Sequence, residues 1–255
     1  MNNSAMRTLT ILEYVAELKR SVTLSELSRE LAIPKTSAFD IVQILLEKGF
    51  LETDSHDPKA YRLGLRAFQV GSAYINNTDL CRTARPFLER LKNETGETVY
   101  LAVESSGRIV YLDKVESDFP IRSIMNIGSS NAMHLTGLGK ALLAAYPEQK
   151  VRKITGGGKL QTRTPNTIGD YDSLLAHLKV IRENGYSFDN GEDTELVRCM
   201  AAPVYDSMSK PVAAVSISML AANLTPEKKE HFSKNVIKTA LAVSGKLGYP
   251  RSSLY

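Results

Sequence analysis

The residues from Thr23 to Ser37 constrain the fold of this chain more than any other stretch. Thr23 can cap a helix, and Glu26 three positions later completes a capping box. Pro34 suits the first position of a second helix, because its missing N–H costs nothing there. Two short helices joined by a tight turn are typical of a helix-turn-helix, whose second helix can enter the DNA major groove, and an ordinary helical hairpin is the alternative. The first helix repeats apolar residues at helical spacing, namely Leu24, Leu27 and Leu31.

The flanking residues favour a winged helix-turn-helix. The segment Phe50–Thr53 and the segment Ala60–Leu63 are strand-like and enclose the turn-rich residues 54–59, so they predict a hairpin after the third helix. Gly49 is placed to end that third helix. The first helix carries an apolar stripe made of Leu9, Leu12, Val15, Ala16 and Leu18. The third helix carries a stripe made of Ala38, Ile41, Val42 and Leu45.

The opposite face of the third helix is the candidate DNA-reading surface. Gln43 could pair with adenine, and Phe39 could either touch a thymine methyl group or pack beneath the hairpin. Asp40 would be repelled by phosphates unless it reads a cytosine amino group. Residues 1–66 contain nine Lys and Arg and nine Asp and Glu, so any basic surface here is local. The candidate DNA contacts are Ser25, Lys35, Thr36, Ser37, Phe39, Asp40, Gln43, Lys59 and Arg62.

Length and composition bound the remaining possibilities. A chain of 255 residues is about right for two domains, and its net charge of +4 is mildly basic. No apolar run approaches the roughly 18 residues of a membrane span, so no membrane partner is expected. The N-terminal residues Met1–Ser4 lack the pattern of a signal peptide, and the two cysteines do not suggest a disulfide framework. We therefore expect a cytoplasmic protein.

The pattern of elements predicts an α+β protein of two domains. A helix from Leu65 to Ile75 links the N-terminal domain to strands that begin at Thr98. The predicted divisions are a DNA-binding domain over residues 1–64, a linker helix over 65–77 and a second domain over 78–250. In that second domain we expect further strands at Ile121–Ile124, Arg198–Tyr205 and Pro211–Leu220, and helices at Gly137–Tyr146, at Tyr171–Asn184 and after Thr225.

Two features of the second domain suggest a ligand site. Neither Gly137–Lys140 nor Gly156–Lys159 satisfies the phosphate-loop motif. We therefore do not expect nucleotide hydrolysis. Glycines at the start of a helix leave N–H groups open to an anion, although a closely packed turn is the simpler interpretation. Ser216 and Ser218 point to the same face of a strand, where they line a polar pocket or bond to local backbone.

The remaining reactive side chains do not form a recognisable catalytic or metal site. Cys199 lies in an apolar strand, where a free cysteine usually behaves as a small hydrophobe. The four histidines show no ligand spacing with either cysteine, so we expect no metal, no cofactor and no enzyme activity. Asp189 either accepts a hydrogen bond from a ligand hydroxyl or is a solvated turn residue beside Asn190 and Gly191.

Five motifs make the chain resemble the IclR family of bacterial transcriptional regulators over nearly its whole length. They are Pro34–Ser37, Tyr61–Gly64, Leu135–Ala141, Arg163–Thr167 and Val197–Val204. The resemblance implies a winged helix-turn-helix, a linker helix that contributes to dimerisation and an effector-binding domain related to the GAF fold. It also implies a homodimer or homotetramer that binds a double-stranded DNA operator.

The same resemblance implies which residues bind the effector. Many members carry His-Arg where this chain has Phe39-Asp40, and a glycine where it has Leu196, so the DNA sequence read and the pocket loop differ here. We expect a ligand-responsive repressor of a catabolic operon whose effector is a small organic acid. The alternative is a small-molecule sensor or enzyme whose helix-turn-helix serves packing or protein contacts. The implied effector contacts are Asn131, Gly137, Leu138, Asp189, Cys199, Ser216 and Ser218, with the polar Asn131 hinting at a hydrophilic effector.

Overall fold

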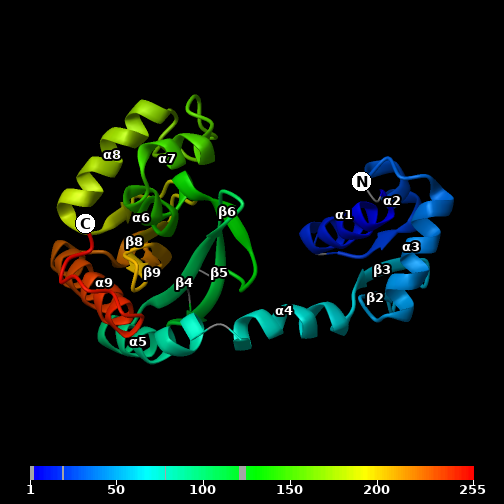
Figure 1. The fold of residues 1–255 in the computed structure, drawn as a ribbon, viewed down its shortest axis with the longest axis horizontal. Helices are drawn as coiled ribbons and strands as arrows, with labels where there is room; N and C mark the ends of the chain where they lie inside the picture. The colour runs from blue at the N-terminus through cyan, green and yellow to red at the C-terminus, as the bar shows by residue number, and fades with distance from the viewer. Residues whose placement is uncertain (1–2, 19, 78, 121–124) are drawn as a thin grey trace. The chain divides into compact units, whose positions relative to one another are not determined.

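The computed structural model describes residues 3–18, 20–77, 79–120 and 125–255. The chain forms two compact units, Met1–Asn77 and Thr78–Tyr255, which Figure 1 shows in blue to cyan and in cyan to red. The linker helix α4 (Leu65–Asn77) belongs to the first unit. No helix in these four described ranges is both long enough and apolar enough to cross a bilayer.

The first unit is a winged helix-turn-helix. Three helices, α1 (Asn3–Leu18), α2 (Leu24–Glu30) and α3 (Lys35–Glu47), precede the hairpin strands β2 (Leu51–Thr53) and β3 (Ala60–Leu63). The two-residue strand β1 (Val22–Thr23) pairs with β3, which gives an antiparallel sheet in the order β1-β3-β2. The predicted hairpin and all three predicted helices are confirmed.

Local hydrogen bonds explain the tight turn between α2 and α3. The Thr23 hydroxyl accepts the backbone N–H of Glu26 at 3.3 Å, which is the expected helix cap. At the other end Ala32 adopts a left-handed conformation with φ 51°, and the Ser28 hydroxyl donates to the carbonyl of Ile33 at 2.8 Å. Pro34 is the cap residue immediately before α3, one position earlier than predicted.

The apolar core of the first unit confirms part of the predicted stripe of α1 and corrects the rest. Val15 is buried, and Leu12 and Leu18 pack against the core. Ile11, which the predicted stripe omitted, is also buried, whereas Leu9 is 58 % exposed and Ala16 is exposed. Apolar residues at positions 9, 11 and 12 fit two neighbouring stripes, and only packing against α3 and the sheet selects one of them. The stripe predicted for α3 is confirmed, because Ala38, Ile41, Val42 and Leu45 are all buried.

Two glycines allow the hairpin to pack closely against the end of α3. Gly49 ends the helix with φ +72°, a conformation that other residues rarely adopt. Gly64 follows β3, and a Cβ atom there would lie 2.4 Å from the carbonyl oxygen of Gly49. The backbone of the returning strand therefore touches the helix end directly, which only a residue without a side chain permits.

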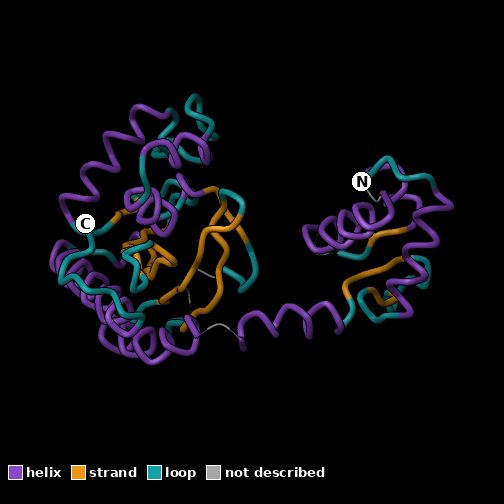
Figure 2. Tube along the Cα trace, viewed as in Figure 1, coloured by secondary structure: helices purple, strands orange, loops and turns teal. Residues whose placement is uncertain are grey.

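The second unit is built on a six-stranded antiparallel sheet in the order β6-β5-β4-β9-β8-β7, with its strands drawn in orange in Figure 2. Its central strands are β4 (Thr98–Ser105) and β9 (Pro211–Leu220), flanked by β5 (Arg108–Val115) and β8 (Val197–Tyr205). The edge strands are β6 (Ser130–Ala132) and β7 (Ser187–Asp189). The strands predicted at Arg198–Tyr205 and Pro211–Leu220 are confirmed, and the one at Ile121–Ile124 lies outside the described residues.

Helices cover both faces of this sheet (Figure 1). Helices α5 (Asp79–Thr95) and α9 (Pro226–Lys246) pack together on one face. Helix α6 (Gly137–Ala145) packs on the other face and is backed by α8 (Tyr171–Asn184). The predicted helices in this unit are confirmed, while α7 (Glu148–Thr155) was not predicted. The relation to the GAF fold stays a prediction.

Candidate functional site

The exposed face of α3 gathers most of the predicted DNA contacts. Lys35 and Thr36 are exposed in its first turn, and Asp40 and Gln43 are exposed further along. Phe39 is 48 % exposed and is not among the apolar side chains that pack against the core, so it does not lie beneath the hairpin. The remaining predicted residue of α3, Ser37, is half-buried, and Ser25 is exposed on α2.

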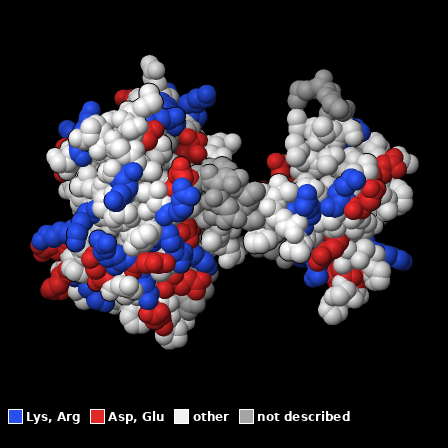
Figure 3. Space-filling model, turned by 60° about the horizontal axis from the view of Figure 1, so that its bottom comes forward, with Lys and Arg blue, Asp and Glu red and all other residues white. Residues whose placement is uncertain are grey.

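The two cations of the predicted wing differ in their surroundings. Lys59 is exposed in the turn before β3, whereas the Arg62 guanidinium pairs with the Glu52 carboxylate at 2.8 Å. Such an exposed pair contributes little stability, so a phosphate can displace Glu52 at small cost. The face drawn in Figure 3 carries both signs of charge in alternation on the two units, in agreement with the neutral balance of residues 1–66.

The second unit contains a cavity of about 60 Å³ between α6 and the sheet. A single water needs roughly 10–15 Å³ of such space, so the cavity admits a compact ligand. Six of the seven predicted effector contacts line it, and they come from four elements: α6, β7, β8 and β9. These are Gly137, Leu138, Asp189, Cys199, Ser216 and Ser218.

The N-terminus of α6 supplies hydrogen-bond donors to the cavity. The Thr136 hydroxyl caps the helix by accepting the N–H of Gly139 at 3.0 Å, and the Thr136 carbonyl accepts the N–H of Lys140 at 3.0 Å. The N–H groups of Gly137 and Leu138 occupy the first two helix positions, where no intrahelical acceptor exists. The Ser187 hydroxyl on β7 donates to the Gly137 carbonyl at 2.6 Å and fixes this helix start beside the sheet.

The sheet places hydroxyl groups opposite those donors. Ser216 and Ser218 both line the cavity, as their spacing on one strand predicts. Register brings Tyr100 of β4 beside Ser216, and Cys199 of β8 beside Ser218, whose hydroxyl oxygen lies 3.3 Å from the Cys199 sulfur. Cys199 is partly exposed where it lines the cavity, and desolvation raises the pKa of its thiol above the ordinary value. The thiol is therefore protonated and unreactive at neutral pH.

Asp189 is a buried carboxyl group in the lining of this cavity. Burial raises the pKa of its carboxyl from 3.8 to about 6, although the nearby Lys140 ammonium opposes the shift. Its Oδ1 accepts the backbone N–H groups of Gly191 at 3.0 Å and Glu192 at 2.8 Å. The interpretation of Asp189 as a solvated turn residue is wrong, because the side chain is buried against the cavity.

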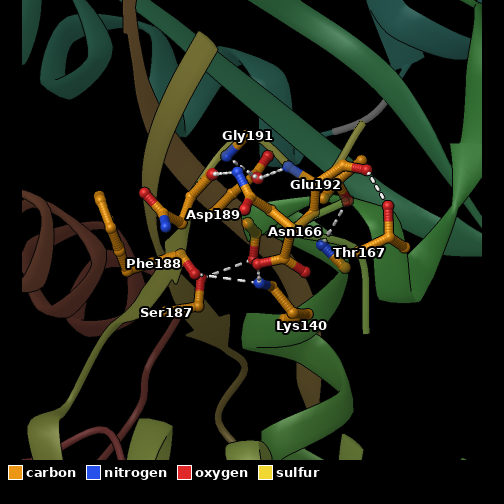
Figure 4. A network of polar contacts seen from close by, with 12 residues as sticks. Lys140, Asn166, Thr167, Ser187, Phe188, Asp189, Gly191 and Glu192 are labelled. Atoms are coloured by element: carbon orange, nitrogen blue, oxygen red, sulfur yellow. Dashed lines mark hydrogen bonds and ion pairs between the residues drawn. The ribbon is translucent and has the colours of Figure 1, made fainter. Parts of the chain in front are cut away.

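A fully buried ion pair lies beside this carboxyl (Figure 4). The Lys140 ammonium of α6 pairs with Glu192, and it also donates to the carbonyl of Phe188 at 3.0 Å. Glu192 lies in the loop after β7, and the segment Arg163–Thr167 holds this loop from the other side. The Thr164 hydroxyl donates to the Gly191 carbonyl at 2.7 Å, and the Thr167 hydroxyl donates to the Glu192 carbonyl at 2.6 Å. The loop after β7 is thus fixed by α6 and by a loop before α8.

Asn131 is the one predicted effector contact that does not line the cavity. It is buried on β6, and its amide donates to Asp193 at 2.9 Å, so it lies one layer behind the wall. The sequence interpretation missed Tyr100 and Asp193. Tyr100 could have been found from its alternation in β4, whereas Asp193 lies in a loop with no periodicity. The other missed lining residues are Tyr111, Met125, Thr136, Thr194 and Val197.

The buried Asp189 carboxyl makes the stability of the protein depend on pH. Because its pKa is higher in the folded state, stability falls as pH rises from about 4 to about 6 and this loss is complete above pH 6. We expect Asp189→Asn, which keeps the Oδ1 acceptor, to be more stable than wild type above pH 6 by up to about 3 kcal/mol, and equal to it near pH 4. Urea unfolding between pH 4 and pH 8 measures this difference. The exposed control Asp172→Asn should run parallel to wild type, and parallel curves for Asp189→Asn would contradict the expectation.

The cavity has the chemistry of a binding site. In the described part of the chain, no group of three His, Cys, Asp or Glu side chains is arranged to hold a metal ion. The lining combines backbone and hydroxyl donors with a carboxyl group, and its thiol is not activated. Such a set can hold a small polar molecule in one orientation.

Comparison with known proteins identifies the family. The model described as the IclR helix-turn-helix domain matches residues 4–55, and the model described as the C-terminal part of the bacterial transcriptional regulator IclR matches residues 72–245. The second match alone covers more than half of the chain. Both units therefore correspond to the two parts of one regulator family.

Curated and solved relatives agree with these matches. The chain is 30 % identical over 247 residues to the HTH-type transcriptional regulator KdgR of Dickeya chrysanthemi, covering 97 % of this chain and 80 % of KdgR. It is 34 % identical over 242 residues to the HTH-type transcriptional repressor AllR of Escherichia coli K12, covering 95 % and 89 %. The crystal structure of IclR from Thermotoga maritima has a TM-score of 0.76 and 31 % identity, covering 98 % of this chain and all of that one. The winged helix, the second α+β unit and these relatives together show that the chain belongs to the IclR family, as a DNA-binding transcriptional regulator and not an enzyme.

Proposed function

We propose that this regulator is a repressor of a catabolic operon, and that a small organic acid bound in the cavity of the second unit controls it. The observation that carries the proposal is the convergence of the first two residues of helix α6, Gly137 and Leu138, whose N–H groups have no acceptor within the helix, with Ser216 and Ser218 in the lining of one small cavity. The name of the AllR relative as a repressor supports the direction of control.

The donor set favours a carboxylate as the anchoring group of the effector. Backbone N–H groups at a helix N-terminus stabilise negative charge, and serine hydroxyls can donate to the same oxygens. Asp189 can accept a hydrogen bond from a hydroxyl group when it is ionised, and can donate to an oxo oxygen when it is protonated. Asp189 by itself therefore accommodates either a hydroxy acid or an oxo acid.

On the DNA side, α3 is the proposed recognition helix. Its first turn would contact phosphates and base edges through Lys35, Thr36 and Ser37, and its exposed face would read bases through Phe39, Asp40 and Gln43. Ser25, Lys59 and Arg62 would contact the DNA backbone.

A homodimer or homotetramer would present two such helices to the half-sites of one operator. Exposed apolar side chains on α4 support self-association, namely Leu65, Phe68 and Val70.

DNA binding should be strongly dependent on salt. We expect the full-length protein to bind the DNA upstream of its own operon, with log affinity falling linearly as log salt concentration rises. Lys35→Ala should weaken binding and reduce the slope by about 1, because one phosphate contact is lost. Lys48→Ala, at the opposite end of α3, should leave the slope unchanged. Fluorescence anisotropy at several salt concentrations gives the slopes, and binding that does not respond to salt would argue against the proposed interface.

The effector response should depend on the two serines of β9. A screen of small organic acids for thermal stabilisation of the full-length protein identifies ligands, since binding to the folded state raises the melting temperature. We expect Ser216→Ala with Ser218→Ala to remove both this stabilisation and the release of DNA by the acid, while DNA affinity without acid is retained. The exposed Ser207→Ala is the control. A double variant that still responds would show that the effector binds elsewhere.

A further inference from the structure

Asp193 is a wall residue of the cavity held in place from two sides. Its Oδ1 forms an ion pair with Arg163, and its Oδ2 accepts the Asn131 amide at 2.9 Å. Asn131 is itself fixed, because its Oδ1 accepts the N–H of Ala132 at 2.8 Å, and only 2 % of its surface is exposed. Three segments that are distant in sequence therefore place a negative charge at a defined point of the cavity.

The described lining of the cavity offers no cation to a second acidic group. Its charged side chains are Asp189 and Asp193, and none of the described lining residues is Lys, Arg or His. Outside the lining, Lys140 is paired with Glu192 and Arg163 with Asp193, and the Arg198 guanidinium donates to the backbone carbonyls of Glu195 and Val197. The helix N-terminus can offset one carboxylate of a ligand, whereas a second carboxylate would meet like charge at short range.

The start of α6 and Asp193 differ in hydrogen-bonding character, and both line the cavity. Gly137 and Leu138 offer N–H donors. An ionised carboxylate only accepts hydrogen bonds, and its two oxygens have about four acceptor positions. Arg163 and Asn131 each use one position on Asp193, so further positions remain for a ligand. A ligand that bonds to both carries an acceptor for the start of α6 and a hydrogen-bond donor for Asp193.

We propose that Asp193 determines effector specificity: the cavity takes a monocarboxylate that carries a hydroxyl or N–H donor, and it rejects the corresponding oxo acid and dicarboxylates. This inference rests on the proposed binding of an organic acid. An oxo oxygen facing Asp193 would place two acceptors together with no proton between them, which costs the site a charge-assisted hydrogen bond. A site that hydrogen-bonds a hydroxyl group of its ligand strongly rejects analogues that lack this group.

Isothermal titration of the full-length protein tests this specificity with matched pairs of acids. The pairs are 2-hydroxypropanoate against 2-oxopropanoate, and 3-hydroxybutanoate against 3-oxobutanoate, which sample two spacings between the carboxylate and the oxygen. Propanedioate is the dicarboxylate probe. We expect at least one hydroxy acid to bind about tenfold or more tightly than its oxo partner, and no binding of propanedioate.

The variant Asp193→Asn should change this selectivity in a defined way. Its neutral amide offers both an acceptor and a donor, so the preference for the hydroxy acid should fall to below about threefold and propanedioate should bind. The control Asp172→Asn removes an exposed carboxylate on α8 and should behave as wild type. Thermal unfolding of both variants shows whether they are folded, and the comparison of acids in wild type is decisive even without a variant.

The outcomes separate this inference from the proposed function. Equal affinity of the hydroxy and oxo acids for wild type, or unchanged selectivity in a folded Asp193→Asn variant, would overturn the role of Asp193 and leave the organic-acid site standing. Failure of every acid to bind would remove the proposed effector class, and the specificity inference with it.

Discussion

Gly139→Ala should unfold the second unit at temperatures at which the wild-type protein is folded. A Cβ atom at this position would lie 2.1 Å from the carbonyl oxygen of Met133 and 2.4 Å from its Cα. These are backbone atoms of a buried 3-10 turn, Met133–Leu135, so no side chain can rotate to relieve the clash. Overpacking of a core commonly costs about 1–3 kcal/mol, and we expect a loss above about 3 kcal/mol here because backbone must move.

Thermal unfolding followed by circular dichroism measures this effect. The matched control is Gly158→Ala, because a Cβ atom at Gly158 meets nothing within 4 Å. We expect the control to unfold close to the wild-type temperature. The Gly139 variant should also lose effector binding, since Gly139 holds the first turn of α6 against its Thr136 cap. Equal melting temperatures for the two variants would show that the helix start is not packed as described.

The second large effect is expected from Lys140→Met, which leaves the Glu192 carboxylate buried without its cation. Neither side chain is more than 4 % exposed, and Glu192 Oε2 has no hydrogen-bond partner in the described part of the protein. Breaking a buried pair by removing one partner typically costs about 3–5 kcal/mol. We expect a loss of stability in this range in urea unfolding at pH 7.

A double variant separates the cost of the stranded charge from lost packing. Lys140→Met combined with Glu192→Leu replaces the pair by apolar groups of similar size, and such replacements are often neutral or stabilising. The double variant should therefore recover at least half of the stability lost by Lys140→Met. Additive losses would show that the pair contributes mainly through packing, contrary to this expectation.

The same variants test whether the pair supports the proposed effector site. Lys140 and Glu192 do not line the cavity, yet Glu192 carries a backbone N–H that donates to Asp189 and lies next to Asp193. The ammonium of Lys140 thus fixes the loop that holds both carboxyl groups of the wall. In the stable double variant, the effector affinity should fall although no lining side chain has changed.

Much of the fold could be predicted because its signals are local. Caps and glycines mark where helices begin and end, as Thr23 does for α2 and as Gly185, with φ +79°, does for α8. Alternation along a strand predicts which residues share a face, and it placed Ser216 and Ser218 together correctly. The stripe of α1 was only partly correct, because several apolar residues lie side by side and local periodicity does not choose between neighbouring faces. Val15 is buried as predicted, whereas Leu9 is exposed and the buried Ile11 was missed.

The lining of the cavity in the second unit was only partly predictable, because only some of its residues lie in regular elements. Sequence and family resemblance together identified six of its lining residues, because these lie in recognisable motifs of regular elements. Asp193 lies in an irregular loop, and its direction is set by Arg163 and Asn131 from other parts of the chain. The exposed Leu196, on the same loop, lies outside the cavity lining in spite of its position in the family pattern.

By itself, the sequence determined the order of the elements, the helix-turn-helix and the family, since each depends on residues close together in the chain. Only the tertiary structure decided which buried charges meet. Lys140 and Glu192 are 52 positions apart, and Asn131 and Asp193 are 62 positions apart. A buried charge must find a partner wherever packing brings one, and periodicity along the chain carries no information about that partner. The charge balance of the cavity in the second unit, from which the proposed kind of ligand follows, is therefore a property of the folded molecule.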